Sequence, residues 1–329
     1  MKGKVLALVM AAAMCFTGCG NLYQNTVLVP EKAVELVLAI PEDGPQSLVE
    51  VARELARRAE DFAGSTIAVE LRPVEDIWQT IIHGEADLAI SENSRIAEYS
   101  PRLRQLESPY CFMGSQNLVS AANAPEVLDA LNYSLEPYTP MTLRRIASSG
   151  RMDIIIKDSE KLRLWREEKE PFRLAVEQGT GDDEALSEQW NIQLIESPDP
   201  LDALEREGAD AAEIELARDI GALDGEMIIF SGHRINMVDI FCREDTLHQM
   251  KPEQQAAVEE AIVYAAGYCR TLSEDAYKKV QQQVDEQNIA IAEPDIRWLY
   301  EQFQLYYLHP EQGPDKKLMK LLKQHGDRF

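Results

Sequence analysis

The chain has 329 residues, of which 57 are Asp or Glu and 33 are Lys or Arg, so its formal net charge is −24. This surplus of negative charge argues against nucleic acid as a partner and against broad contact with anionic lipid. The length is sufficient for two lobes, each with its own core.

The first residues predict export. Two early lysines precede an apolar run, Val5–Met14, that matches the core of a signal peptide and is too short to span a bilayer. Gly18-Cys19 follows, as at the site where a lipoprotein signal is cut and its cysteine acylated. We expect a signal peptide over 1–18, a lipid on Cys19 and a tether over 19–34. The protein would then be exported and lipid-anchored at the outer face of the cell membrane. If the segment is instead an ordinary signal peptide and Cys19 is incidental, the protein would still be exported.

Strands and helices alternate after the tether. Apolar residues at spacings of three and four predict a helix over 47–63, and Gly64 and Gly84 are placed to end two helices. The resulting βαβαβ pattern predicts an α/β lobe with a largely parallel sheet. The expected elements are a strand over 35–40, the helix over 47–63, a strand over 66–71, a turn and helix over 73–83, and a strand over 86–90.

The alternation returns later and predicts a second sheet. A single long helical pattern covers 252–284. The basic amphipathic segment 315–323 fits a packed terminal helix or, alternatively, contact with lipid headgroups. The other expected elements are strands over 173–176, 192–195, 209–214, 227–230 and 235–242, and helices over 182–190, 200–208 and 295–307.

The sequence contains no motif that nominates a reaction. It has no GxSxG elbow, Walker loop or HExxH helix, and no two of its five histidines share a helical face at metal-ligand spacing. We therefore expect no enzyme activity, no cofactor and no metal. Three widely spaced cysteines, Cys111, Cys242 and Cys269, are expected to be small buried side chains rather than a disulfide or metal framework.

From Leu36 to about Phe303 the chain resembles the extracytoplasmic solute-binding subunits of TRAP transporters, the DctP family. The resemblance rests on five segments in the same order as in the family, and any one of them alone is weak. They are Leu36–Pro73, Ile81–Ile90 (IIHGEADLAI), Leu106–Phe112 (LESPYCF), Ala203–Glu213 (ALEREGADAAE) and Ser231–His233 (SGH).

This resemblance implies a two-lobed periplasmic-binding-protein-like α/β fold with a long hinge-crossing helix. It implies a monomer that captures a small organic acid between its lobes and delivers it to the membrane permease subunits of a secondary transporter. The corresponding boundaries are 35–148 plus 237–275 for lobe 1, 149–236 plus 276–308 for lobe 2, and 309–329 for a C-terminal tail helix.

The resemblance also nominates ligand-binding residues. Family members bind a ligand carboxylate with an arginine at the position where this chain has Ala175. Arg173, two residues earlier, is the nearest residue that could take over this role. Alternatively, Arg173 is an exposed charge at the end of a strand. Gly150-Arg151 matches the segment that carries a second family arginine, so Arg151 is a candidate for binding ligand. The alternative is that Arg151 is an ordinary surface arginine. The family asparagine that bonds ligand is replaced here by Ile214.

Polar residues after predicted strands complete the candidate set. Glu92 and Asn93 follow a strand end in the first lobe, where the family presents polar groups, although an ordinary loop is equally consistent. The loop with Gln178 and Thr180 precedes a predicted helix, and its exposed backbone N–H groups could bind an anion. Glu213 is expected to contact ligand or to hold Arg151.

Two other functional classes stay open. Because Ala175 and Ile214 are apolar, the chain could be an orphan or sensory module with a non-standard ligand, which signals through a partner. An extracellular hydrolase would need a nucleophile–base pair or a metal cluster, and the sequence displays neither.

Overall fold

The structure, a computed structural model, describes residues 32–97, 99–168, 170–177, 191–206, 208–223, 226–292, 301 and 315–326. The predicted signal peptide, Cys19 and nearly all of the tether lie outside these residues, as do Gln178, Thr180 and the helices predicted over 182–190 and 295–307. None of the helices in the described ranges is both long enough and apolar enough to serve as a membrane span.

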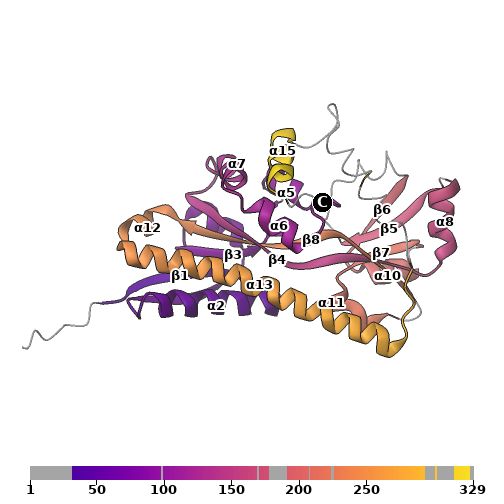
Figure 1. Cartoon of the computed structure of the whole chain (residues 1–329), viewed down its shortest axis with the longest axis horizontal. Helices are drawn as coiled ribbons and strands as arrows, with labels where there is room; N and C mark the ends of the chain where they lie inside the picture. Colours follow the sequence, from indigo (N-terminus) through magenta and orange to yellow (C-terminus); the bar gives the residue numbers. More distant parts are fainter. Residues whose placement is uncertain are drawn as a thin grey trace, which may run out of the picture. The chain divides into compact units, whose positions relative to one another are not determined.

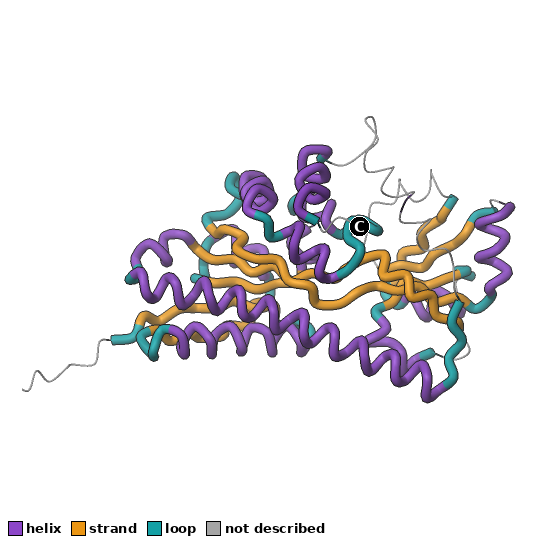
Figure 2. Tube along the Cα trace, viewed as in Figure 1, coloured by secondary structure: helices purple, strands orange, loops and turns teal. Residues whose placement is uncertain are grey.

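A single mixed sheet of eight strands organises the described chain, in the order β2-β1-β3-β8-β4-β7-β5-β6 (Figures 1 and 2). The expectation of two separate sheets is therefore wrong, because β4 and β8 pair antiparallel and belong to both halves. The strands are β1 (Val34–Pro41), β2 (Ile67–Val74), β3 (Leu88–Glu92), β4 (Met141–Ile156), β5 (Phe172–Glu177), β6 (Ile192–Ser197), β7 (Ala211–Ile214) and β8 (Met227–Arg243).

Helices cover both faces of this sheet. The described helices are α2 (Gln46–Phe62), α3 (Ile77–His83), α4 (Asn93–Ala97), α5 (Pro101–Leu106), α6 (Ser115–Ala122), α7 (Pro125–Leu135), α8 (Ser159–Glu168), α10 (Pro200–Arg206), α11 (Leu216–Asp219), the 3₁₀ turn η1 (Ile220–Ala222), α12 (Glu244–Gln249), α13 (Pro252–Gln287) and α15 (Lys316–His325).

The long helix α13 packs against both halves of the sheet. Near its start, Val258 and Ile262 share a buried cluster with α2 and with strands β1, β3 and β8. Near its end, Val280 and Val284 join a second cluster with β5, β7, α10 and α11. Figure 1 shows α13 running beside α2 at one end and reaching α11 at the other. The single long helix predicted from the periodicity is confirmed.

The apolar spacing of α2 accounts for its position. Leu48, Val51 and Leu55 are all buried, as expected for one face of a helix laid on a sheet. Each such side chain stabilises the fold by roughly 1.5–3 kcal/mol relative to an exposed one. The helix ends where the chain reaches Gly64, whose φ of 58° is the left-handed conformation that glycine adopts without steric cost.

The C-terminal helix α15 packs as a terminal helix, which settles one alternative left by the sequence. Its apolar residues Leu318, Met319 and Leu322 are buried in the cluster that also contains residues of α6 and α7. Because this apolar face is covered by protein, it is not presented to a membrane.

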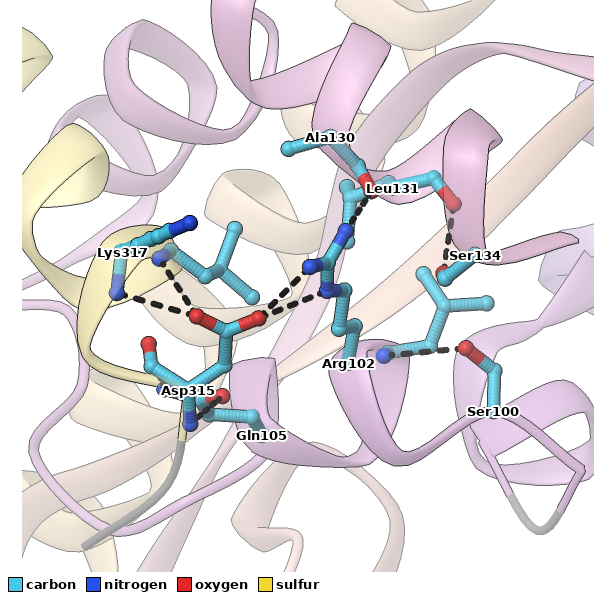
Figure 3. Close-up of polar contacts among 10 residues, drawn as sticks. Ser100, Arg102, Gln105, Ala130, Leu131, Ser134, Asp315 and Lys317 are labelled. Carbon is cyan, nitrogen blue, oxygen red and sulfur yellow. Dashed lines mark hydrogen bonds and ion pairs between the residues drawn. The ribbon is translucent and has the colours of Figure 1, made fainter.

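Polar contacts fix the start of α15 (Figure 3). Asp315 caps the helix by accepting from the backbone N–H groups of Lys317 at 2.9 Å and Leu318 at 3.2 Å. The same carboxylate pairs with Arg102 of α5 at 2.7 Å, and Gln105 accepts from the Asp315 backbone at 3.0 Å. One side chain thus satisfies the helix end and anchors it to α5.

The three cysteines within the described ranges are free thiols. Cys242 and Cys269 are buried, as predicted, whereas Cys111 is half-buried. Burial raises the pKa of each thiol to about 12, so they remain protonated at neutral pH.

Candidate ligand-binding site

The strand register defines where the two halves of the sheet meet. β3 runs antiparallel to β8 and ends with Glu92 opposite Val238. β7 runs antiparallel to β4 and ends with Ile214 opposite Asp153. Because β4 and β8 are themselves antiparallel, the carboxyl ends of β3 and β7 point toward each other.

Between these two strand ends lies a short stretch of β4 and β8, residues 148–152 and 234–237, that we call the crossover. In the described sheet, the crossover part of β4 pairs with β8 alone. The β4–β8 register shifts twice here, between Ser148 and Gly150 and between Met152 and Ile154. Ligands of open α/β sheets bind beyond the carboxyl ends of strands, so the crossover is the candidate site.

Arg151 occupies the crossover in a fixed orientation. Its Nε donates to Asp153 at 3.2 Å, and its guanidinium lies 3.6 Å from the ring centre of Tyr277 on α13. The side chain is 33% exposed. Among the described residues, neither terminal nitrogen of Arg151 has a hydrogen-bond partner. A guanidinium held in this way can donate two parallel hydrogen bonds to a carboxylate.

The residue that orients Arg151 is itself fully buried. Asp153 also accepts from the backbone N–H of Gly232 at 2.8 Å. Burial raises the pKa of Asp153, although Arg151 and the Gly232 N–H oppose this change. The φ of Gly232, 49°, is in the left-handed region, which permits the close turn that brings its N–H to the carboxylate.

A second carboxylate at the crossover, Glu215, was not among the predicted residues. It follows β7 directly and accepts from Asn236 of β8 at 3.2 Å. Burial raises the pKa of Glu215 to about 7; the charges of Asp219 and Glu92 act in the same direction and Arg218 opposes them. The clue to Glu215 in the sequence is its position immediately after a predicted strand. Its neighbours in space cannot be identified until the register of the strands is known.

The predicted residue Glu92 also lies at the crossover, where its charge contributes to the raised pKa of Glu215. Glu92 accepts from Nε of Arg95 at 3.0 Å, and Arg95 pairs through Nη1 with Asp43 at 2.7 Å. The neighbouring Asn93 is fully buried and donates to the Leu103 carbonyl at 3.4 Å. Glu92 thus acts on Glu215, and Asn93 lies beside Glu107, whose pKa, raised by burial, responds also to Asn93 and to Arg234 of the crossover.

Glu213 forms an ion pair, although not with Arg151. It is buried and accepts from Nε2 of His233 at 2.7 Å, and Nε of Arg234 lies 3.3 Å away. Nδ1 of His233 lies 2.7 Å from the Ser231 hydroxyl. The alternative in which Glu213 holds Arg151 is therefore wrong, because Asp153 has that position.

The structure does not bring Arg173 to the crossover. It lies near the start of β5, and its guanidinium bonds to Asp210 through Nε at 3.2 Å and Nη2 at 3.1 Å. β5 runs parallel to β7, and Arg173 lies beside the start of β7. It is the other end of β7, at Ile214, that reaches the crossover. Ala175 faces the apolar cluster beneath α10 and is fully buried.

Comparisons with known proteins identify the fold. No protein-family model and no curated protein matches the chain. A TRAP periplasmic solute-binding protein from Rhodobacter sphaeroides, in an apo open form, is similar with a TM-score of 0.74 and 13% identity over 89% of this chain and 99% of that one. The sugar acid binding protein from Advenella mimigardefordensis, in complex with galactonate, has a TM-score of 0.64 and 14% identity over 90% and 99%.

A third similar structure is a TRAP periplasmic solute-binding protein from Desulfovibrio desulfuricans with bound sn-glycerol-3-phosphate. Its TM-score is 0.66, with 14% identity over 89% of this chain and 97% of that one. At these identities the likeness concerns the fold. The α/β architecture that the five sequence segments implied is thereby confirmed, and the chain has the two-lobed fold of the TRAP periplasmic solute-binding proteins.

Proposed function

We propose that this chain is an extracytoplasmic solute-binding protein that captures a small organic acid at the crossover and delivers it to the membrane subunits of a TRAP-type transporter. The observation that carries this proposal is Arg151, whose guanidinium is fixed by Asp153 and Tyr277 while both terminal nitrogens keep their hydrogen-bond donors. The fold shared with TRAP solute-binding proteins supports it.

The capture step fits the strand geometry. Closure of two halves on a ligand bends the segments that join them. The two register shifts in the crossover interrupt regular pairing at the point where bending is required. We propose that the halves correspond to the lobes predicted from sequence, 35–148 plus 237–275 and 149–236 plus 276–308.

The remaining parts of the proposal concern partners and location. We propose that Cys19 carries the lipid anchor, that the chain acts as a monomer, and that Arg151 and Glu92 contact the solute. Gln178 and Thr180 stay predictions. The contacts of Arg173 with Asp210, and the buried positions of Asn93 and Glu213, favour structural roles for these three residues.

A sensory role is the second candidate, and one observation favours it. Ala175 and Ile214 stand where the resemblance expects polar ligand contacts, and both lie in one buried apolar cluster. A chain without these contacts fits a non-standard ligand. Genes for permease subunits beside this gene would favour transport, and a histidine kinase gene would favour sensing.

Thermal unfolding of the mature protein against a panel of organic acids, each with its amide, tests the proposed function. At a concentration about 100 times its dissociation constant, a bound acid should add about 2.7 kcal/mol of stability. We expect a rise in melting temperature with at least one acid and none with its amide. Shifts with neutral compounds alone, or with no compound, would contradict a carboxylate site.

A further inference from the structure

The C-terminal helix α15 carries a row of lysines at its surface. Lys317, Lys320 and Lys323 recur every three residues, which places them along one side of the helix. All three are exposed, whereas Leu318 and Leu322 on the other side are buried. Within the part of the chain that the structure describes, none of the three lysines forms an ion pair. In the described chain, this row, which we call the lysine face, therefore keeps its positive charge.

The helices around the lysine face contain no acidic residue. α15 lies beside α5 and α6 (Figure 1), and within the bounds of these three helices there is no Asp or Glu, although 57 of the 329 residues are acidic. Asp315, just before α15, is neutralised by Arg102 at 2.7 Å. Glu126 of α7 lies 3.4 Å from His325, at the end of α15 away from Lys317. The three helices thus form a positive surface on a chain whose net charge is −24.

The charge of this surface fits an anionic bilayer. A lysine is a point charge on a flexible stem, whereas an arginine matches a single carboxylate with a rigid fork. Mobile phospholipid headgroups can gather beneath such point charges, and each lysine near an anionic bilayer strengthens attachment about fivefold. At physiological ionic strength the Debye length is about 8 Å. Carboxylates elsewhere on the chain are therefore largely screened from a bilayer that touches the lysine face.

The packing of α15 determines the kind of contact that is possible. Its apolar side is covered by residues of α6 and α7, so the helix does not offer an apolar surface for insertion between acyl chains. Contact is then limited to the charged headgroup layer. A lipid on Cys19 would hold the folded chain close to that layer, because the segment from Cys19 to Val34 can span at most about 50 Å. This proximity raises the effective concentration of headgroups at the lysine face.

We propose that the lysine face binds the anionic phospholipid headgroups of the membrane to which the protein is anchored, and so turns α15 toward the bilayer. None of its residues belongs to the crossover, so the interaction does not depend on the identity of the solute. It requires the proposed lipid on Cys19 only to bring a membrane near. Vesicles supplied in solution meet that requirement directly.

Sedimentation of the mature chain, residues 19–329 without the lipid, together with vesicles tests this proposal. The vesicles contain phosphatidylcholine alone or in equal parts with phosphatidylglycerol. We expect binding to the mixed vesicles and none to phosphatidylcholine, and we expect the binding to disappear at about 1 M salt, where the Debye length falls to about 3 Å. The triple variant Lys317→Gln, Lys320→Gln and Lys323→Gln should lower the partition into the mixed vesicles roughly 100-fold, at about fivefold for each lysine.

A second triple variant, Lys161→Gln, Lys278→Gln and Lys279→Gln, is the matched control. It removes three exposed lysines from α8 and α13 and gives the same net charge, so it should keep nearly all of the wild-type partition. Equal binding of wild type to both kinds of vesicle, binding to neither, or the same loss in both triple variants would overturn the proposal. A lysine face that instead serves an acidic protein would give the second of these results. The proposed solute-binding function stands or falls separately.

Discussion

Glu213→Gln is expected to lower the free energy of unfolding by about 3–5 kcal/mol at pH 7, the usual cost of removing one partner from a buried ion pair. Glu213 lies on β7 and is 1% exposed. It compensates the charge of Arg234, whose Nε is 3.3 Å away, and accepts from His233 at 2.7 Å. Glutamine keeps the shape of the side chain but not its charge. Urea unfolding of the two proteins measures the difference.

The pH dependence gives this prediction a second readout. Burial alone would raise the pKa of Glu213, but Arg234 and His233 outweigh it and hold the value below the ordinary 4.5. A depressed pKa stabilises the fold above the unfolded value and loses that contribution as the pH falls through the folded one. The difference between wild type and variant should therefore shrink below about pH 4. A difference under about 1 kcal/mol at pH 7 would contradict the ion pair, and Glu196→Gln should change stability by less than about 0.5 kcal/mol.

Glu215→Gln is expected to act in the opposite direction and to stabilise the fold at pH 8 by up to about 3 kcal/mol. The folded carboxyl has its pKa raised to about 7 from an ordinary value of 4.5. Each unit of difference corresponds to about 1.36 kcal/mol. Glutamine avoids this cost because it does not ionise, and it retains an acceptor for Asn236.

The size of this stabilisation depends on pH in a defined way. Between about pH 4.5 and 7 the folded state holds the Glu215 proton that the unfolded state has lost, so wild-type stability falls as the pH rises. The gain from Glu215→Gln should be full at pH 8 and absent near pH 4. Equal stabilities at pH 8, or the same gain at both pH values, would show that the half-buried carboxylate of Glu215 does not destabilise the fold when it ionises.

The elements that the sequence predicted well are those with regular apolar spacing and clear ends. The helix expected over 47–63 is α2, Gln46–Phe62, since its buried side chains recur at three and four residues. The helix expected to end at Gly84 does so: Asp76 caps it at the start, and Gly84 has a left-handed φ of 62° at its end. In both elements the local pattern and the tertiary burial agree.

Strand β4 was not predicted, and its irregularity explains why. Met141–Ile156 contains Arg144, Arg145 and Arg151, and three register shifts interrupt its pairing with β8. A bulge changes which face a side chain meets, so the alternation that identifies a strand is lost. The same irregularity divides β8, whose residues 227–230 and 235–242 were expected as two strands. Without β4 and β8 as continuous strands, a single sheet could not be predicted.

The candidate site was predictable only in part, for the same reason. The resemblance nominated Arg151 from a loosely matching motif and Glu92 from its place after a strand end, and both lie at or beside the crossover. Glu215, Gly150 and Asn236 meet through strand register, which the order of residues does not reveal. Conversely, Arg173 was nominated as a substitute for the arginine that the family has at the position of Ala175, but its ion pair with Asp210 is a tertiary contact that the sequence does not reveal.

Titration of the strongest-binding acid into wild type and Arg151→Ala tests the central claim most directly. Arg173→Ala is the matched control, because it removes a partly exposed arginine held by Asp210 outside the crossover. If Arg151 binds the carboxylate, its removal should weaken binding by about 1.5–3 kcal/mol, or roughly 10- to 150-fold, while Arg173→Ala leaves the affinity unchanged. Equal affinities of wild type and Arg151→Ala would remove Arg151 from the site and contradict a carboxylate-binding crossover.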